Sequence, residues 1–153
     1  MLSRWQKFRR LSRSAQKLFL QAFCLLALTG LAIRLFNFQR TQLALQRSLP
    51  IGKPNSRDSS AALVQQTARM VRAADNHGPL DGNCLRQSLV LWWLLRRQGI
   101  ESELRIGVRK AGARFEAHAW VEWRGRALNE RDDVRQRFAA FEEPILGAPI
   151  ELQ

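Results

Sequence analysis

Apolar positions divide the chain into an N-terminal stretch, two helical segments and a group of strands. The N-terminal stretch, residues 18–33, is mostly apolar and is closed by Arg34. It falls short of the roughly 20 apolar residues that a helix needs to cross a bilayer. Basic residues precede it, as on the cytoplasmic flank of a membrane segment. We expect a buried helix, or one that lies on a membrane surface, in preference to a membrane span.

A polar run at residues 50–57 is the clearest linker in the chain. It contains two prolines and a glycine, which interrupt both helices and strands. We therefore expect a basic and apolar helical segment over residues 1–49, followed by one catalytic-looking domain over residues 58–153.

Two helices are predicted at the start of this domain. Residues 58–60 cap the first helix and residues 76–79 end it. Its apolar stripe repeats at three-to-four spacing and consists of Leu63, Thr67, Met70, Val71 and Ala74. The second helix runs over about residues 84–98, with Gly99 as its C-terminal stop. It is apolar on every side over residues 89–95, which predicts burial all round.

Three strands should follow. Residues 101–110 alternate polar and apolar side chains, and a turn at Ala111-Gly112 leads to a second alternating segment, residues 114–123. A hairpin turn at Arg124-Gly125 then leads to a short third strand, residues 126–129. Helices followed by an antiparallel meander make an α+β fold.

The net charge of +12 is concentrated in the N-terminal third. Residues 1–57 carry eleven Lys or Arg and no acidic residue, whereas residues 58–153 are close to neutral. Such asymmetry indicates an anionic partner for the N-terminal segment. The segment lacks the alternating aromatic residues that single-stranded nucleic acid would stack on, so we expect no nucleic acid partner.

The two cysteines stand in different contexts. Cys24 lies inside the apolar N-terminal stretch and is interpreted as a packing residue. Cys84 follows the polar loop Asp81-Gly82-Asn83 and opens a helix, where unpaired backbone N–H groups and the helix dipole stabilise a thiolate. No motif for a metal, a phosphate or a cofactor is present, and we expect two free thiols in a reducing compartment.

His118 is the candidate base for this nucleophile. Alanines flank it on a predicted strand, and it shares a strand face with Glu116, Trp120 and Glu122. His77, in a Gly-Pro loop, is interpreted as an exposed turn residue. A third group should orient the imidazole, and the hairpin brings residues just past Leu128 beside it. The candidates there are Asn129, Glu130, Asp132 and Asp133.

Two stretches resemble the transglutaminase-like B-protein family of lasso-peptide biosynthesis. They are Asn-Cys-Leu-Arg-Gln-Ser-Leu-Val-Leu-Trp-Trp, beginning at Asn83, and Phe-Glu-Ala-His-Ala-Trp-Val-Glu-Trp, beginning at Phe115. The resemblance covers residues 83–138 closely. The N-terminal helices also look like those of the stand-alone form, which lacks a fused precursor-recognition domain.

The resemblance implies a leader peptidase, a cysteine protease that cuts the leader from a ribosomally made precursor. Its catalytic Cys and His fall on Cys84 and His118. The family's third residue, usually Asp, falls twelve positions beyond the His, where this chain has Glu130; Asn129 is the alternative. The implied partners are the precursor leader, a small precursor-recognition protein and a lasso cyclase. From the charge and apolar pattern we also expect a cytoplasmic protein whose N-terminal segment has a membrane surface as a candidate partner.

Two other interpretations remain open at this point. The same residues would serve an amine-accepting, transglutaminase-like acyltransferase. Alternatively, the chain is a non-catalytic membrane-associated adaptor, in which the basic apolar N-terminus is the working part and the Cys-His site is vestigial.

Overall fold

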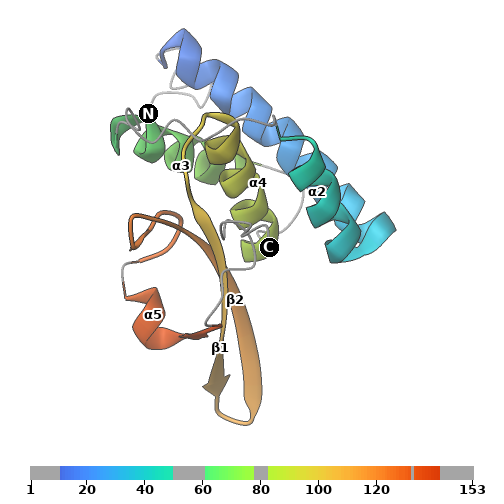
Figure 1. Cartoon of the computed structure of the whole chain (residues 1–153), viewed down its shortest axis with the longest axis vertical. Helices are drawn as coiled ribbons and strands as arrows, with labels where there is room; N and C mark the ends of the chain where they lie inside the picture. The colour runs from blue at the N-terminus through green and yellow to red at the C-terminus, as the bar shows by residue number, and fades with distance from the viewer. Residues whose placement is uncertain (1–10, 50–60, 78–82, 132, 142–153) are drawn as a thin grey trace, which may run out of the picture.

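The computed structural model describes residues 11–49, 61–77, 83–131 and 133–141. Figure 1 shows a layer of helices from which a long β-hairpin extends. The elements in chain order are α2 (Arg13–Arg47), α3 (Ala61–Asp75), α4 (Cys84–Arg97), β1 (Glu103–Ala111), β2 (Arg114–Trp123), β3 (Arg126–Ala127), α5 (Val134–Arg137) and β4 (Ala139–Ala140). The fold is α+β, as predicted. The predicted linker at 50–57 and the caps at 58–60 lie outside the described residues.

The strands form one antiparallel sheet in the order β3-β2-β1-β4. The predicted meander is confirmed, but the β1–β2 turn is one residue later than predicted, because Ala111 pairs with Arg114. Arg124 and Gly125 adopt positive φ angles of 50° and 76°, which suit a tight hairpin turn. The fourth strand was not predicted, since two alanines carry no alternating pattern.

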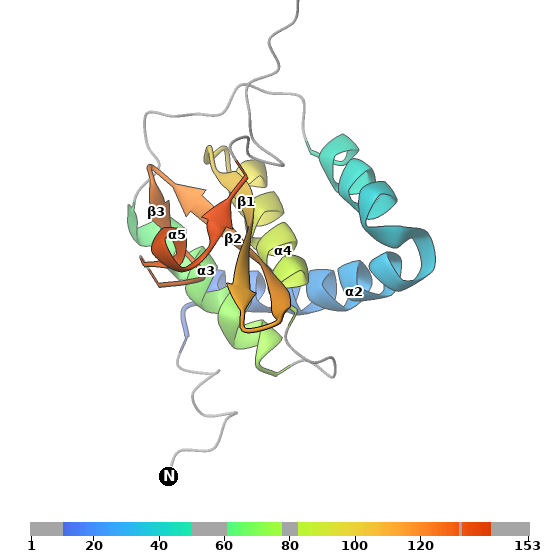
Figure 2. The ribbon, with the colours of Figure 1, turned by 90° about the horizontal axis from the view of Figure 1, so that it is seen from below.

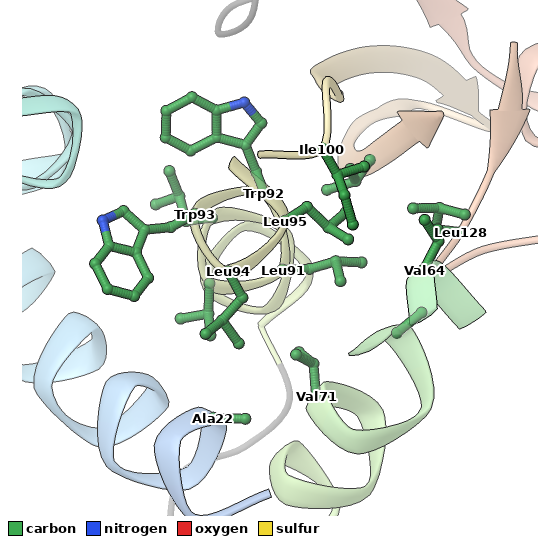
Figure 3. Packing of buried hydrophobic residues seen from close by; sticks show 14 of the residues in the cluster. Ala22, Val64, Val71, Leu91, Trp92, Trp93, Leu94, Leu95, Ile100 and Leu128 are labelled. Carbon is green, nitrogen blue, oxygen red and sulfur yellow. The ribbon is translucent and has the colours of Figure 1, made fainter. Parts of the chain in front are cut away.

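The core surrounds α4. Residues from Leu89 to Leu95 are at most 7% exposed, which confirms a helix buried on all sides. Figure 3 shows this helix end-on, with Val64 and Val71 of α3 and Ala22 of α2 pointing toward it. The helix ends as predicted at Gly99, whose φ of 75° allows the Ile100 N–H to donate to the Leu95 carbonyl at 2.9 Å.

The buried face of α3 differs slightly from the apolar stripe that was predicted for it. Val64, Thr67, Ala68, Val71 and Ala74 are buried. Leu63, which we expected in the stripe, is 39% exposed, and that prediction is wrong. Val64 takes its place because the buried arc passes through residues 64, 67, 68 and 71, at the spacing of one helix face.

α2 is longer than predicted and bends at Asn37, whose φ of 67° is not helical. The Asn37 side chain accepts from the Arg40 N–H at 3.2 Å and so caps the second limb. Figure 2 shows the two limbs at an angle. The second limb contacts α4 through Trp93, whose Nε1 donates to the Leu45 carbonyl at 3.2 Å.

By length and composition α2 is apolar enough to cross a membrane. One side of it nevertheless packs in the core through Leu18, Ala22 and Leu26. Cys24 points away from that side and is exposed, so the prediction that it is a packing residue is wrong. It lies two residues from both Ala22 and Leu26, about half a turn around the helix from each.

Candidate active site

Cys84 is the first residue of α4 and its side chain is half-buried. The preceding residue, Asn83, is the N-cap, and its Oδ1 accepts from the Leu85 N–H at 2.9 Å. This hydrogen bond uses one of the backbone N–H groups that have no partner inside the helix. Other such N–H groups at the helix start lie near Cys84. The thiol therefore lies at the positive end of α4, as the sequence predicted.

Buried polar contacts hold the start of α4 in place. The Arg86 Nη2 atom lies 2.6 Å from Asp75 Oδ1, and both side chains are 5% exposed. Gln87 Nε2 donates to the other oxygen of the same carboxylate at 3.0 Å. The last residue of α3 thus fixes the residues that follow Cys84.

A second set of contacts joins α4 to β2 next to the candidate histidine. Ser88 Oγ donates to the carbonyl of Ala119 at 3.0 Å. Asn129 links the two elements, because its Nδ2 donates to Ser88 Oγ at 2.9 Å and its Oδ1 accepts from the Val121 N–H at 2.8 Å. These contacts fix how far along β2 the helix lies.

The contacts of Ser88 show which part of β2 lies beside the first turns of α4. α4 and β2 run in the same direction (Figure 1). Cys84 is one turn before Ser88, which is about 6 Å along the helix. That is roughly two residues along a strand. The start of α4 therefore lies near the part of β2 that contains Ala119.

The imidazole itself points to the other face of β2. Val121 packs with the helices, whereas His118 shares its face with Trp120 and Phe138. Among the described residues, no hydrogen bond joins the Cys84 thiol to His118. The thiol and the imidazole thus belong to neighbouring elements and are not directly paired.

His118 and Glu130 are brought together. His118 Nε2 lies 2.7 Å from Glu130 Oε2. An ionised carboxylate can only accept hydrogen bonds, so Nε2 of His118 carries the hydrogen. Nδ1 then has no hydrogen and can accept a proton. Burial opposes the charge on Glu130, but hydrogen bonds from the Arg131 N–H and His118, with nearby positive charge, lower its pKa. The carboxylate therefore remains ionised at neutral pH.

The other candidates for the third group lie elsewhere. The Asn129 side chain faces Ser88 and Val121, on the side of the sheet that carries α4. Asp133 lies 3.7 Å from Arg137 Nη1, as expected for an acidic residue that balances a surface helix. Asp132 lies outside the described residues. His77 is exposed, as predicted, with Nδ1 2.6 Å from the Ala73 carbonyl.

Phe138 supports the imidazole, a role that was not predicted from the sequence. Its ring stacks on His118 with centroids 5.1 Å apart. Gly107, paired with His118 in the sheet, makes room for this contact, because a Cβ there would lie 2.9 Å from Trp120 and 3.1 Å from Phe138. A glycine inside a strand often marks a place where another part of the chain comes close to the backbone. Gly107 is therefore the sequence signal that could have indicated this contact.

Glu122 holds the segment that carries Phe138. Its buried carboxylate accepts from Trp120 Nε1 and Arg135 Nε, each at 2.7 Å. Burial opposes the charge on Glu122, but these hydrogen bonds and the nearby Arg135 and Arg105 lower its pKa. Arg135 belongs to α5, so the ion pair ties α5 to β2.

The residues that the structure describes contain no group of three His, Cys, Asp or Glu side chains arranged to hold a metal ion. They contain a thiol at a helix N-terminus and, on a neighbouring strand, an imidazole that a carboxylate orients. This arrangement can support nucleophilic chemistry at sulfur.

The family model of the transglutaminase-like superfamily matches residues 25–143. The chain belongs to this superfamily. Transglutaminase-like proteins are typically catalytic and include cysteine peptidases and acyltransferases. The matched region begins inside α2, in keeping with the packing of that helix on α3 and α4. No curated protein and no solved structure matches the chain significantly.

Proposed function

We propose that the protein is a cysteine peptidase that removes the leader from a ribosomally made lasso-peptide precursor. The observation that supports the catalytic part is the His118–Glu130 pair, in which a carboxylate orients the imidazole. The choice of substrate rests on the resemblance of residues 83–138 to lasso-peptide B-proteins.

In the proposed mechanism, His118 Nδ1 takes the proton of the Cys84 thiol. The thiolate attacks the carbonyl carbon of the last leader residue, and a C–S bond forms. The Cys84 backbone N–H, at the start of α4, stabilises the negative charge on the carbonyl oxygen. The imidazole faces the other side of β2 before substrate binds, so the proposed step requires a rearrangement at the start of α4 that brings the sulfur to the imidazole in the substrate complex.

His118 then protonates the nitrogen of the scissile bond, and the C–N bond breaks. The core peptide leaves with a free N-terminal amine. Water attacks the thioester, gives a proton to His118 and releases the leader with a C-terminal carboxylate, which restores the thiol. Glu130 accepts from Nε2 throughout and stabilises the imidazolium that forms in each half of the reaction.

We propose that this reaction takes place in the cytoplasm, together with a small precursor-recognition protein and a lasso cyclase. The support for these partners is the resemblance to the stand-alone form of the family. Such a form needs a separate protein to recognise the leader.

Mass spectrometry of the precursor, incubated with this protein and the recognition protein, tests the proposal. We expect a leader that ends in a carboxylate, with one ¹⁸O from labelled water, and a core peptide with a free amine. Cys84→Ala should abolish both products, and Cys24→Ser, the matched cysteine variant, should leave them unchanged. A product in which an added amine is joined to the leader would show an acyltransferase. If Cys84→Ala is as active as the parent, Cys84 is not the nucleophile and the adaptor interpretation remains.

A further inference from the structure

The outward side of the first limb of α2 forms an apolar strip that no described element covers. Its members are Leu20, Leu28, Leu31 and Leu35, and each is between 53% and 65% exposed. They follow one another at eight, three and four residues, which places them within an arc of about 80° on one side of the helix. Cys24 and Ala27, also exposed, complete the strip between them.

Positive charge lies at both ends of this strip. Arg13 and Lys17 are exposed on the same side before it, and Arg34 is exposed near its end. Lys17 and Arg34 are about 25 Å apart at the helical rise of about 1.5 Å per residue. α2 has no acidic residue, so nothing on the helix balances these cations.

The positive charge beside the strip indicates whether a second copy of the chain or a membrane covers it. A second copy of the chain would place two cationic helices side by side, which is unfavourable. Anionic lipid headgroups attract the cations, and the acyl chains beneath them accept the leucines. This combination is what interfacial helices with basic and apolar residues use.

The opposite side of α2 indicates that the helix lies on the bilayer and does not cross it. Leu18, Ala22 and Leu26 are buried against the other helices. A span would strip this side from the domain and expose α4 residues such as Leu94, which points toward Ala22 (Figure 3), to water. A helix that lies flat keeps those contacts and buries only the exposed leucines.

We propose that the outer strip of α2 docks the protein onto an anionic membrane surface. In this arrangement the domain stays in water, and the first limb of α2 lies parallel to the bilayer with Arg13, Lys17 and Arg34 at headgroup level. This inference is independent of the proposed peptidase reaction.

The test is cosedimentation of the full-length protein with vesicles. We expect binding to vesicles of phosphatidylcholine with about 30% phosphatidylserine, and at least about tenfold weaker binding to pure phosphatidylcholine. The double substitution Leu28→Gln/Leu31→Gln should weaken binding at least about tenfold. Phe115→Gln, at a residue 78% exposed on the β-hairpin, is the matched control and should bind as the parent does.

Two further readouts complete the experiment. The thermal melting temperature of Leu28→Gln/Leu31→Gln should equal that of the parent, since the substituted side chains are exposed. Alkaline carbonate should release the bound protein from the vesicles. The proposal is overturned by equal binding to both vesicle types, by unchanged binding of the double variant, by resistance to carbonate, or by a lipid-free dimer that the double substitution dissociates.

Discussion

His118→Ala should lower the rate of leader removal by about two to four orders of magnitude, because the protein loses both its general base and its general acid. The imidazole takes the thiol proton in the first step and protonates the leaving amine in the second. We expect neither role to pass to His77, the other histidine, because its Nδ1 lies 2.6 Å from the Ala73 carbonyl and its ring packs edge-on against Phe19 of α2. The measurement is single-turnover cleavage of the precursor, followed by mass spectrometry.

Two variants accompany this measurement. His77→Ala removes an exposed imidazole that contacts the Ala73 carbonyl, and cleavage should be unchanged. Glu130→Gln keeps a group that can still accept from Nε2 but loses the charge that stabilises the imidazolium, so cleavage should fall by at least about tenfold. If His118→Ala cleaves as fast as the parent, the imidazole is not part of the reaction.

Asp75→Ala should lower the free energy of unfolding by about 3–5 kcal/mol. The substitution leaves the Arg86 guanidinium, whose side chain is 5% exposed, without its carboxylate. It also removes the acceptor of Gln87 Nε2. Urea denaturation followed by tryptophan fluorescence measures the change, because Trp92 and Trp93 are in the same core.

Glu116→Ala is the matched control for this prediction. Glu116 lies 2.7 Å from Arg109, as close as the buried pair, but both side chains are more than 40% exposed. An exposed pair contributes about 0–1 kcal/mol, so the variant should be nearly as stable as the parent. Equal losses in Asp75→Ala and Glu116→Ala would show that burial of the first pair does not matter.

The sequence predicted those elements whose apolar pattern has one period from end to end. α4, with residues 89–95 apolar on all sides, and the alternating strand at 114–123 both appear at nearly the predicted bounds. The position of Cys84 at a helix start followed from the polar loop before it. Local pattern decides these features, because each depends on neighbours within about one or two turns.

Features that depend on packing between distant elements were missed. A uniformly apolar stretch does not reveal which side of a helix faces the core, so Cys24 was placed inside. The choice between Asn129 and Glu130 depends on where β3 ends, and spacing alone leaves it open. Phe138 reaches His118 because α5 and β4 fold back onto the sheet, held by the Arg135–Glu122 ion pair and by the pairing of β4 with β1.

The central claim is that the Cys84 thiol and the His118 imidazole act on each other although they are on neighbouring elements. The rate of iodoacetamide alkylation at neutral pH tests it most directly, in a Cys24→Ser background where Cys84 is the only thiol. Only the thiolate reacts, and a nearby imidazole increases the thiolate fraction. We predict that His118→Ala slows alkylation of Cys84 by at least about tenfold. Identical rates with and without the imidazole would contradict the account.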